Sequence, residues 1–181
     1  MKKIALFVLL VTLFACSTKQ PAELYTQNQV SLPFKLGKIV YDDKRNDIVP
    51  TEVNLSIMPS KENFKTINPE ILPKLKADSE AIIRKAFRGG ETEYDVVIVI
   101  NKASKGLAKT WEEASETVEV DLTLELTNKE NETLYKANSV FKNKYDAVNV
   151  SDKHAQEMFE ITFKNVLYLG LQEVQKGLKK K

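Results

Sequence analysis

The chain has 181 residues, of which 43% are hydrophobic and 29% are charged. This length suits a single domain with a sizeable hydrophobic core. There are 27 Lys and Arg residues against 25 Asp and Glu residues, and two of the lysines, Lys2 and Lys3, precede an apolar run at the N-terminus. The rest of the chain therefore has no net charge, and this gives no reason to expect nucleic-acid binding.

The first 15 residues have the layout of a secretory signal peptide. Two lysines are followed by a 12-residue apolar run, Ile4 to Ala15, and then by the chain's one cysteine, Cys16. A helix of that length rises about 18 Å, well short of the roughly 30 Å hydrocarbon core of a bilayer. A core helix is also disfavoured, because the run has no polar face. We therefore expect residues 1–15 to be a cleaved export signal.

Leu13-Phe14-Ala15-Cys16 resembles the lipobox of bacterial lipoproteins, with an aliphatic residue three before the cysteine and a small one directly before it. Phe14 departs from the small or hydroxylated residue that is commonest at its position. The resemblance implies cleavage before Cys16, a diacylglycerol on its thiol and an acylated amino group, so that Cys16 is the lipidation site and the lipid bilayer a partner. An ordinary cleaved leader or an uncleaved anchor are the alternatives.

Two further features accompany the lipobox-like segment. A single cysteine in an exported protein has no internal disulfide partner, and lipidation would cap it. Two or three acyl chains anchor a protein firmly, whereas one chain does so only marginally. Ser17 stands where an aspartate would retain an enterobacterial lipoprotein in the inner membrane, so analogy favours the outer membrane, facing the periplasm.

The residues after Cys16 predict a tether followed by one domain. Residues 17–31 are polar, contain a proline and show no sustained period. We expect a lipidated cysteine and flexible tether over residues 16–33 and a single globular domain over residues 34–181.

The domain is expected to begin with a strand at Gly37 to Tyr41, followed by the charged turn "DDKRND". Three aspartates in this turn raise the question of a metal site. A lysine and an arginine lie among them, however, and no calcium-loop pattern is present, so we favour a solvated turn. A second, edge strand is expected at Val53 to Ile57, because prolines bound it.

The middle of the chain predicts a helix and a central strand. The helix should start near Asn68, include Pro73 and stop at Gly89-Gly90, with its apolar residues on one stripe. Tyr94 to Ile100 is continuously apolar and β-branched, which is typical of a strand covered on both faces. The following segment, "NKASKGLAKTW", is expected to be a loop.

A hairpin and a long helix complete the domain. Residues Thr117 to Thr127 alternate strictly between apolar and polar, and Thr133 to Lys144 return after a turn, with lysines opposite acidic residues. A helix should run from Ser151 or Asp152 to about Leu178. Its apolar arc is wider than one stripe, so it is either buried by the sheet and the other helix together, which we favour, or left for a partner.

This order of elements predicts an α+β fold in which an antiparallel sheet of four to five strands packs with two helices as a two-layer sandwich. From Lys35 to about Gln175 it resembles the small YajG-type envelope lipoproteins of Gram-negative bacteria. The similarity lies in "GKIVYDDKRND", "DVVIVI", the long hairpin, and "YDAVNVSDKHAQEMFEITFKNVL". None of these is a catalytic pattern, and the resemblance implies an envelope lipoprotein of poorly defined role.

The search for chemistry gives no catalytic residue, metal site or cofactor. The one histidine, His154, has no cysteine partner, and neither a G-x-S-x-G pattern nor a second histidine is present. Glu112, Glu113 and Glu116 lie near Trp111, but 25 acidic residues make such clusters expected by chance. Trp111 itself either folds onto the core, which we favour, or is exposed as a partner contact.

Three functional classes follow from these observations. The leading one is a non-enzymatic lipoprotein that binds or scaffolds another protein of the cell envelope. The alternative is a carrier or chaperone for a lipid or glycan, and an enzyme is the least favoured. The sequence identifies neither the partner nor the oligomeric state.

Overall fold

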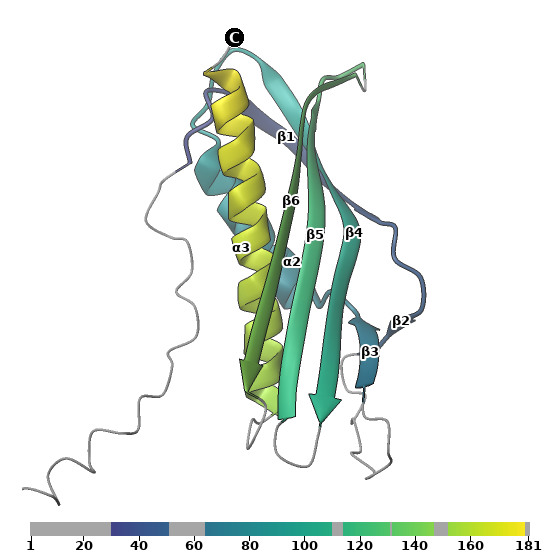
Figure 1. Ribbon diagram of the computed structural model, residues 1–181. Coiled ribbons are helices and arrows are strands. Elements are labelled where there is room, and N and C mark those ends of the chain that lie inside the picture. The colour runs from purple at the N-terminus through teal and green to yellow at the C-terminus, as the bar shows by residue number, and fades with distance from the viewer. Residues whose placement is uncertain (1–29, 51–63, 110–113, 131, 147–151, 180–181) are drawn as a thin grey trace, which may run out of the picture.

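The computed structural model describes residues 30–50, 64–109, 114–130, 132–146 and 152–179. Within these ranges the chain forms a sheet and two helices in an α+β arrangement, which confirms the predicted fold class (Figure 1). In chain order the elements are β1 (Lys35–Asp43), β2 (Ile48–Val49), β3 (Phe64–Pro69), α2 (Pro73–Ala86), β4 (Glu93–Lys109), β5 (Ala114–Thr127), β6 (Thr133–Asp146) and α3 (Asp152–Leu178).

The sheet has six strands in the order β2-β3-β4-β5-β6, with β1 also paired to β4. Along one edge of β4 lies β5, and the other edge is shared, because β1 pairs parallel with the first half of β4 and β3 pairs antiparallel with the second half. The β2–β3 pairing is parallel as well. The sheet is thus mixed and somewhat larger than the antiparallel sheet of four to five strands expected from the sequence.

Strand β4 differs from the prediction in two ways. The segment after Ile100, expected to be a loop, continues as strand to Lys109, because β3 and β5 satisfy its backbone on both edges. A register shift between Ile100 and Lys102 breaks the alternation that would have revealed it. Val97 and Val99 are half-buried, so the apolar run is covered fully on one face only, in contrast to the two covered faces expected.

The β5–β6 hairpin is confirmed, including its alternation. The inward residues of β5 are all buried, namely Val118, Val120, Leu122, Leu124 and Leu126. On the outer face, Glu125 and Lys136 are paired in register and their side chains form an ion pair of 2.8 Å. The expected cross-strand pairing of acidic residues with lysines is therefore present.

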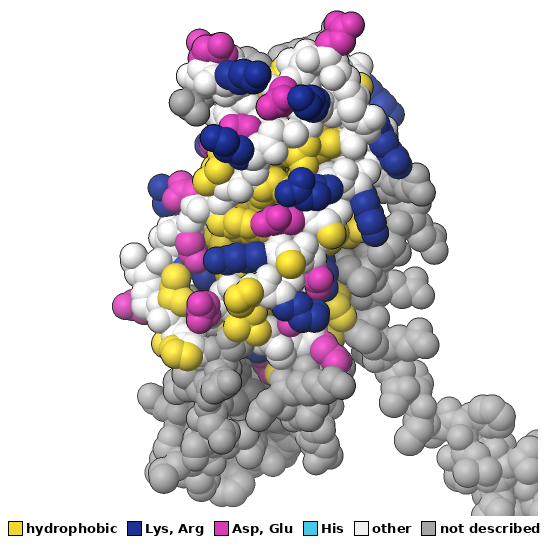
Figure 2. All heavy atoms as spheres, turned by 180° about the vertical axis from the view of Figure 1, so that it is seen from behind, with side chains coloured by type: hydrophobic (Ala, Val, Ile, Leu, Met, Phe, Trp, Pro, Cys, Tyr) yellow, Lys and Arg dark blue, Asp and Glu magenta, His cyan; other side chains and the backbone are white. Residues whose placement is uncertain are grey.

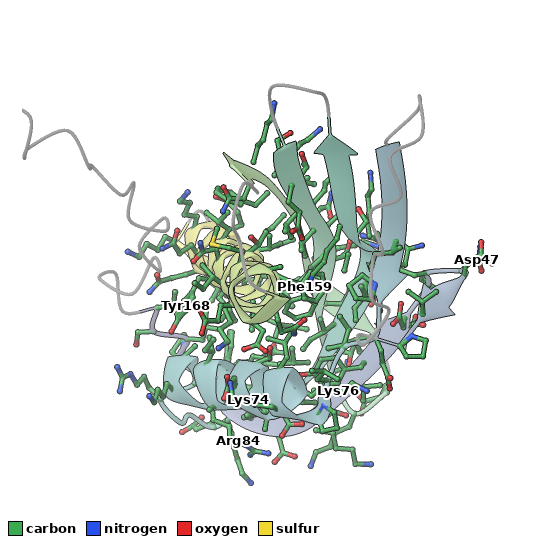
Figure 3. All side chains as sticks on the ribbon, turned by 90° about the horizontal axis from the view of Figure 1, so that it is seen from below. Asp47, Lys74, Lys76, Arg84, Phe159 and Tyr168 are labelled. Carbon is green, nitrogen blue, oxygen red and sulfur yellow. The ribbon has the colours of Figure 1, made fainter. Side chains whose placement is uncertain are left out.

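The first helix begins later than expected, at Pro73, because residues 64–69 pair as β3. The second helix has the predicted bounds and runs for 27 residues. Seen from below, the sheet curves around both helices, and α3 lies between α2 and the part of the sheet formed by β5 and β6 (Figure 3). The wide apolar arc of α3 is accordingly buried by the sheet and α2 together, with the fully buried Phe159, Phe163 and Leu167 at its centre. In the described part of the chain, neither helix is long and apolar enough to cross a membrane.

Gly170 explains how closely α3 approaches the sheet. A Cβ atom at this position would lie 2.7 Å from Leu124 Cδ1 and 3.2 Å from Ser139 Oγ, so the helix backbone almost touches the strands here. A mid-helix glycine costs about 1 kcal/mol in helix propensity relative to alanine. The close packing that it permits offsets this cost.

The packed structure begins earlier than the predicted boundary at Phe34. Val30 and Leu32 are 5% and 0% exposed and belong to the hydrophobic core. The Leu32 amide donates to Ala86 O at 2.8 Å, and Gln175 Nε2 donates to Ser31 O at 2.9 Å. These contacts place residues 30–33, which we expected to belong to the tether, in the folded domain.

Candidate interaction surface

Most residues that the sequence singled out lie outside the described part of the chain. Cys16 and Trp111 both fall outside it, as do Glu112 and Glu113. The backbone of His154 belongs to the first turn of α3. Glu116 lies on β5 and is buried. Among the described residues, no group of three or more His, Cys, Asp or Glu side chains could hold a metal ion.

The charged turn "DDKRND" has a structural role that the sequence did not reveal. Arg45 is buried, with a side chain only 2% exposed. Its Nε and Nη2 donate to the two carboxylate oxygens of Asp43 at 2.8 and 2.7 Å, and its Nη1 donates to the carbonyl oxygens of Pro69 and Ala103 at 2.8 and 3.0 Å. Partial burial raises the pKa of Asp43, but the hydrogen bonds and charge of Arg45 outweigh it and bring the pKa below its usual value. Arg45 is therefore a buried polar junction of β1, β3 and β4, and our expectation of a solvated turn is wrong for this residue. The expectation holds for the exposed Asp43, Lys44, Asn46 and Asp47 around it.

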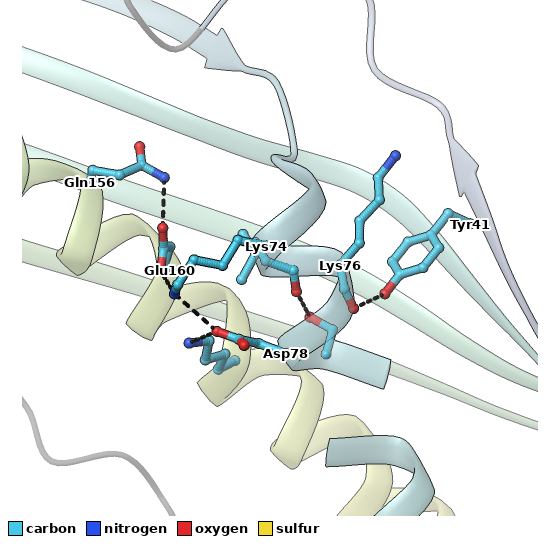
Figure 4. A network of polar contacts seen from close by, with 9 residues as sticks. Tyr41, Lys74, Lys76, Asp78, Gln156 and Glu160 are labelled. Atoms are coloured by element: carbon cyan, nitrogen blue, oxygen red, sulfur yellow. Dashed lines mark hydrogen bonds and ion pairs between the residues drawn. The ribbon is translucent and has the colours of Figure 1, made fainter. Parts of the chain in front are cut away.

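A second polar cluster joins the helices (Figure 4). Lys164 of α3 donates to Asp78 of α2 at 2.7 Å, and Lys74 bridges Asp78 and Glu160 at 3.3 Å to each. The hydrogen bond from Lys164 lowers the pKa of Asp78, and that from Lys74 adds to the effect. On the other side of α2, the hydroxyl of Tyr41 donates to Lys76 O at 3.0 Å. Burial, together with the charge of Glu80, raises the pKa of Tyr41 to about 12. These contacts hold α2 between β1 and α3.

The outer face of the sheet carries a ladder of polar side chains. Asn101 donates to Asp121 and Thr123 at 3.0 and 2.9 Å, and Thr123 donates to Asn138 at 3.1 Å. The ladder connects β4, β5 and β6 across their middle. These side chains satisfy one another, so the ladder orders this face without requiring a ligand.

Charges of both signs are mixed over the face seen in Figure 2. Seen from behind, apolar side chains gather near the middle of the face, and Lys, Arg, Asp and Glu side chains lie among and around them (Figure 2). The residues after Lys3 have no net charge, in keeping with this mixture. A broad single-sign field of the kind used to bind nucleic acid is not visible on this face.

Strand β6 offers a different kind of surface, the outer edge of the sheet. It is the last strand of the sheet order and is 14 residues long. Its register with β5 is unbroken from Ser115–Asp146 to Leu126–Tyr135. Val140, near its midpoint, is 52% exposed and is flanked on the outer face by the exposed lysines Lys136, Lys142 and Lys144. In the sequence these lysines appeared only as partners for the acidic residues of β5, and their position on an edge strand depends on the tertiary fold.

Comparison with known proteins finds only distant structural similarity. No protein-family model matches the chain, and no curated protein shows significant sequence similarity to it. A minor lipoprotein from Acinetobacter baumannii is 7% identical, with a TM-score of 0.46 over 82% of this chain and 95% of that protein. A proposed lipoprotein from Caulobacter crescentus is 10% identical, with a TM-score of 0.42 over 60% of this chain and 83% of that one.

A third structure is a proposed homolog of a neuraminyllactose-binding hemagglutinin from Helicobacter pylori. It is 9% identical, with a TM-score of 0.38 over 84% of this chain and 92% of that one. TM-scores below 0.5 at such identities give no basis for transferring a function. The functional argument therefore depends on the chain's own residues.

Proposed function

We propose that the protein is a lipoprotein of the bacterial cell envelope, held to the bilayer through acylated Cys16, whose α+β domain binds or scaffolds another envelope protein. The observation that carries this proposal is the position of the chain's one cysteine directly after Leu13-Phe14-Ala15, at the end of a 12-residue apolar run preceded by two lysines. This arrangement is typical of an export signal, and its last four residues resemble the lipobox at which bacterial lipoproteins are acylated.

Binding without catalysis is the proposed role of the domain. The acidic side chains of Asp43, Asp78 and Glu125 are each engaged by a cation of the same chain, at 2.7 to 2.8 Å. These contacts stabilise the packing of strands and helices, so we assign these three carboxylates a structural role. The outer membrane, facing the periplasm, is the proposed location, because Ser17 is not the aspartate that favours inner-membrane retention.

The intact mass of the protein made with its own leader in a Gram-negative host tests the anchor. We expect loss of residues 1–15 and a gain in mass equal to a diacylglycerol and an acyl chain on Cys16. Cys16→Ser should abolish both changes, and Ser17→Ala is the matched control that should preserve them. A mature protein with an unmodified thiol at Cys16 would refute the proposal.

Fractionation of the envelope tests the location separately. The wild-type protein should be found in the outer-membrane fraction, and Ser17→Asp should shift it to the inner-membrane fraction. An acylated wild-type protein in the inner membrane would leave the anchor in place and overturn the outer-membrane assignment.

A further inference from the structure

The edges of the sheet differ in how well they are protected against pairing with another chain. Exposed edge strands are commonly kept short, interrupted by bulges, or covered. On one side of the sheet, β2 has only two residues, and β1 has nine with a register shift between Leu36 and Ile39. On the other side, β6 has 14 residues, and its pairing with β5 has no register shift from Tyr135 to Asp146. No described strand pairs with the outer edge of β6.

The backbone of β6 is therefore suited to accept one more strand. Its residues from Thr133 to Asp146 include no proline, so every one of them retains its amide donor. In a strand that has one neighbour, roughly half of the N–H and C=O groups point away from that neighbour. Addition of an extended segment to such an edge obtains its affinity from main-chain hydrogen bonds and its specificity from alternate side chains.

The outer face of β6 defines which alternate side chains would fit. Lys136, Lys142 and Lys144 lie on it with Asn138 and Val140, and it carries no acidic residue among positions 136–144. The neighbour that β6 already has, β5, is complementary, because its outer face carries Glu119 opposite Lys142 and Glu125 opposite Lys136. A strand added on the other edge would meet the same lysines from the opposite side.

A second copy of the chain fits this edge poorly. In an antiparallel pairing of two β6 strands centred on Val140, Lys136 would lie opposite Lys144 of the second copy. Like charges placed directly opposite each other destabilise a sheet. The lysines thus disfavour self-association and leave the edge available to an acidic segment.

We propose that the outer edge of β6 binds an extended segment of another envelope protein that carries Asp or Glu at alternate positions, and that this segment joins the sheet as an additional strand. This proposal specifies the surface and the partner chemistry of the scaffolding role proposed above. It rests on that proposed function only in placing the partner in the cell envelope. The contact would consist of main-chain hydrogen bonds, with Lys142 and Lys144 facing the acidic side chains.

Peptide binding to the acylated, detergent-solubilised protein tests the chemistry. The probe is a fluorescent synthetic peptide with the sequence of residues 117–127, which carries Glu119, Asp121 and Glu125 on one face and whose register with β6 is already known from β5. We expect Lys142→Glu with Lys144→Glu to weaken binding about tenfold, since in the register of β5 the direct contact of Lys142 with Glu119 and the diagonal contact of Lys144 with Glu119 both become repulsive. Lys38→Glu with Lys85→Glu, at exposed lysines on β1 and α2, makes the same change in net charge and should alter affinity less than twofold.

Backbone pairing has its own control. N-methylation of alternate residues of the peptide removes the amides that face one side only. One of the two methylated sets should abolish binding and the other should retain it. Equal binding by both sets, or equal loss in the two double-lysine variants, would refute strand addition at β6.

Site-specific photo-crosslinking in the native envelope tests the occupant. A photoreactive residue at Val140 should capture a protein with an alternating acidic segment, and the Lys142→Glu, Lys144→Glu variant should lose that product. The same residue at Val40, which is 45% exposed on β1, is the matched control and should not capture it. Crosslinks from Val140 only to a second copy, or only to lipid, would overturn the proposal. The intact mass of the protein from the same cells shows independently whether Cys16 is acylated, so either proposal can fail without the other.

Discussion

The guanidinium of Arg45 donates to acceptors on three segments from an almost fully buried position. Asp43 accepts two of its bonds, and the carbonyl oxygens of Pro69 and Ala103 accept the others. The planar group of arginine presents several donors in a fixed fork, and this matches a carboxylate and two carbonyls at once. Removal of a buried partner leaves the remaining polar groups desolvated and unpaired, and the cost of that exceeds the net gain from forming the bonds.

We expect Arg45→Ala to lower the free energy of unfolding by about 3 kcal/mol, measured by urea denaturation. Arg45→Lys should recover less than half of this loss, because an ammonium group cannot form the two-pronged contact with Asp43. The control is Arg84→Ala, which removes an exposed pair with Glu80 of 3.6 Å and should cost no more than about 0.5 kcal/mol. A loss at Arg45 as small as that at Arg84 would show that the junction contributes little.

At the scale of the elements, α3 is fixed from two sides. One side packs on the sheet with Gly170 against Leu124, and the other is tied to α2 through Lys164 and Asp78. The first contact depends on shape and the second on charge. They should therefore respond to different perturbations.

Gly170→Ala should destabilise the protein by about 1 kcal/mol. The substitution improves helix propensity by about 1 kcal/mol, but overpacking against Leu124 at 2.7 Å costs about 2 kcal/mol. In a Leu124→Ala background the main obstruction is gone and only the contact with Ser139 Oγ at 3.2 Å remains, so the same substitution should become stabilising by up to about 1 kcal/mol. The sign change is measured by a double-mutant cycle of urea denaturation. Additive effects of the two substitutions would refute the close contact.

The ion pair between Asp78 and Lys164 should make helix docking sensitive to acid. The native pKa of Asp78 lies below its usual value of 3.8, mainly because of Lys164. Its stabilisation is therefore fully present above the unfolded-state pKa and is lost as the pH falls through the native pKa. At pH 7 we expect Asp78→Asn to reduce stability by about 1 kcal/mol, and this difference from wild type should shrink below about pH 5 as the pH falls through the lowered native pKa.

Thermal unfolding at a series of pH values measures this difference. Glu91→Gln, at an exposed carboxylate between α2 and β4, controls for the loss of one negative charge. A gap between wild type and Asp78→Asn that stays constant down to pH 3 would rule out the linkage.

At the scale of the whole molecule, the sequence predicts features that depend on short-range pattern. The β5–β6 hairpin and α3 follow from alternation and from helical spacing, so they are found with nearly their predicted bounds. The second half of β4 cannot be predicted in this way, because lysines, a glycine and a register shift interrupt its alternation of apolar and polar residues. The burial of Arg45 depends on acceptors 24 and 58 positions away, and the edge position of β6 depends on the order of all strands. For the candidate sites, Cys16 and Trp111 stay predictions of the sequence.

The start of the domain is another long-range feature, and it gives a test of the whole fold. Val30 and Leu32 follow a polar segment and look like part of the tether, yet Leu32 is fully buried. Its amide donates to Ala86 O at the end of α2, and its carbonyl accepts from Arg88 N just after that helix. Burial of a side chain of this size contributes about 1.5 to 3 kcal/mol. Residues 30–33 therefore close the core between α2 and α3 as the last segment before β1.

We expect a soluble version of the protein that begins at Phe34 to be less stable than one that begins at residue 29 by about 3 kcal/mol, because it lacks both buried side chains. Urea denaturation of the two versions measures the difference, and Leu32→Ala in the longer version should reproduce about 2 to 3 kcal/mol of it. Ser31→Ala is the control, since its carbonyl oxygen, which accepts from Gln175, is retained. Equal midpoints of urea denaturation for the two versions would mean that residues 30–33 belong to the tether and not to the folded domain. A large difference would instead mean that the spacing between the proposed anchor at Cys16 and the folded domain is shorter than the sequence implies.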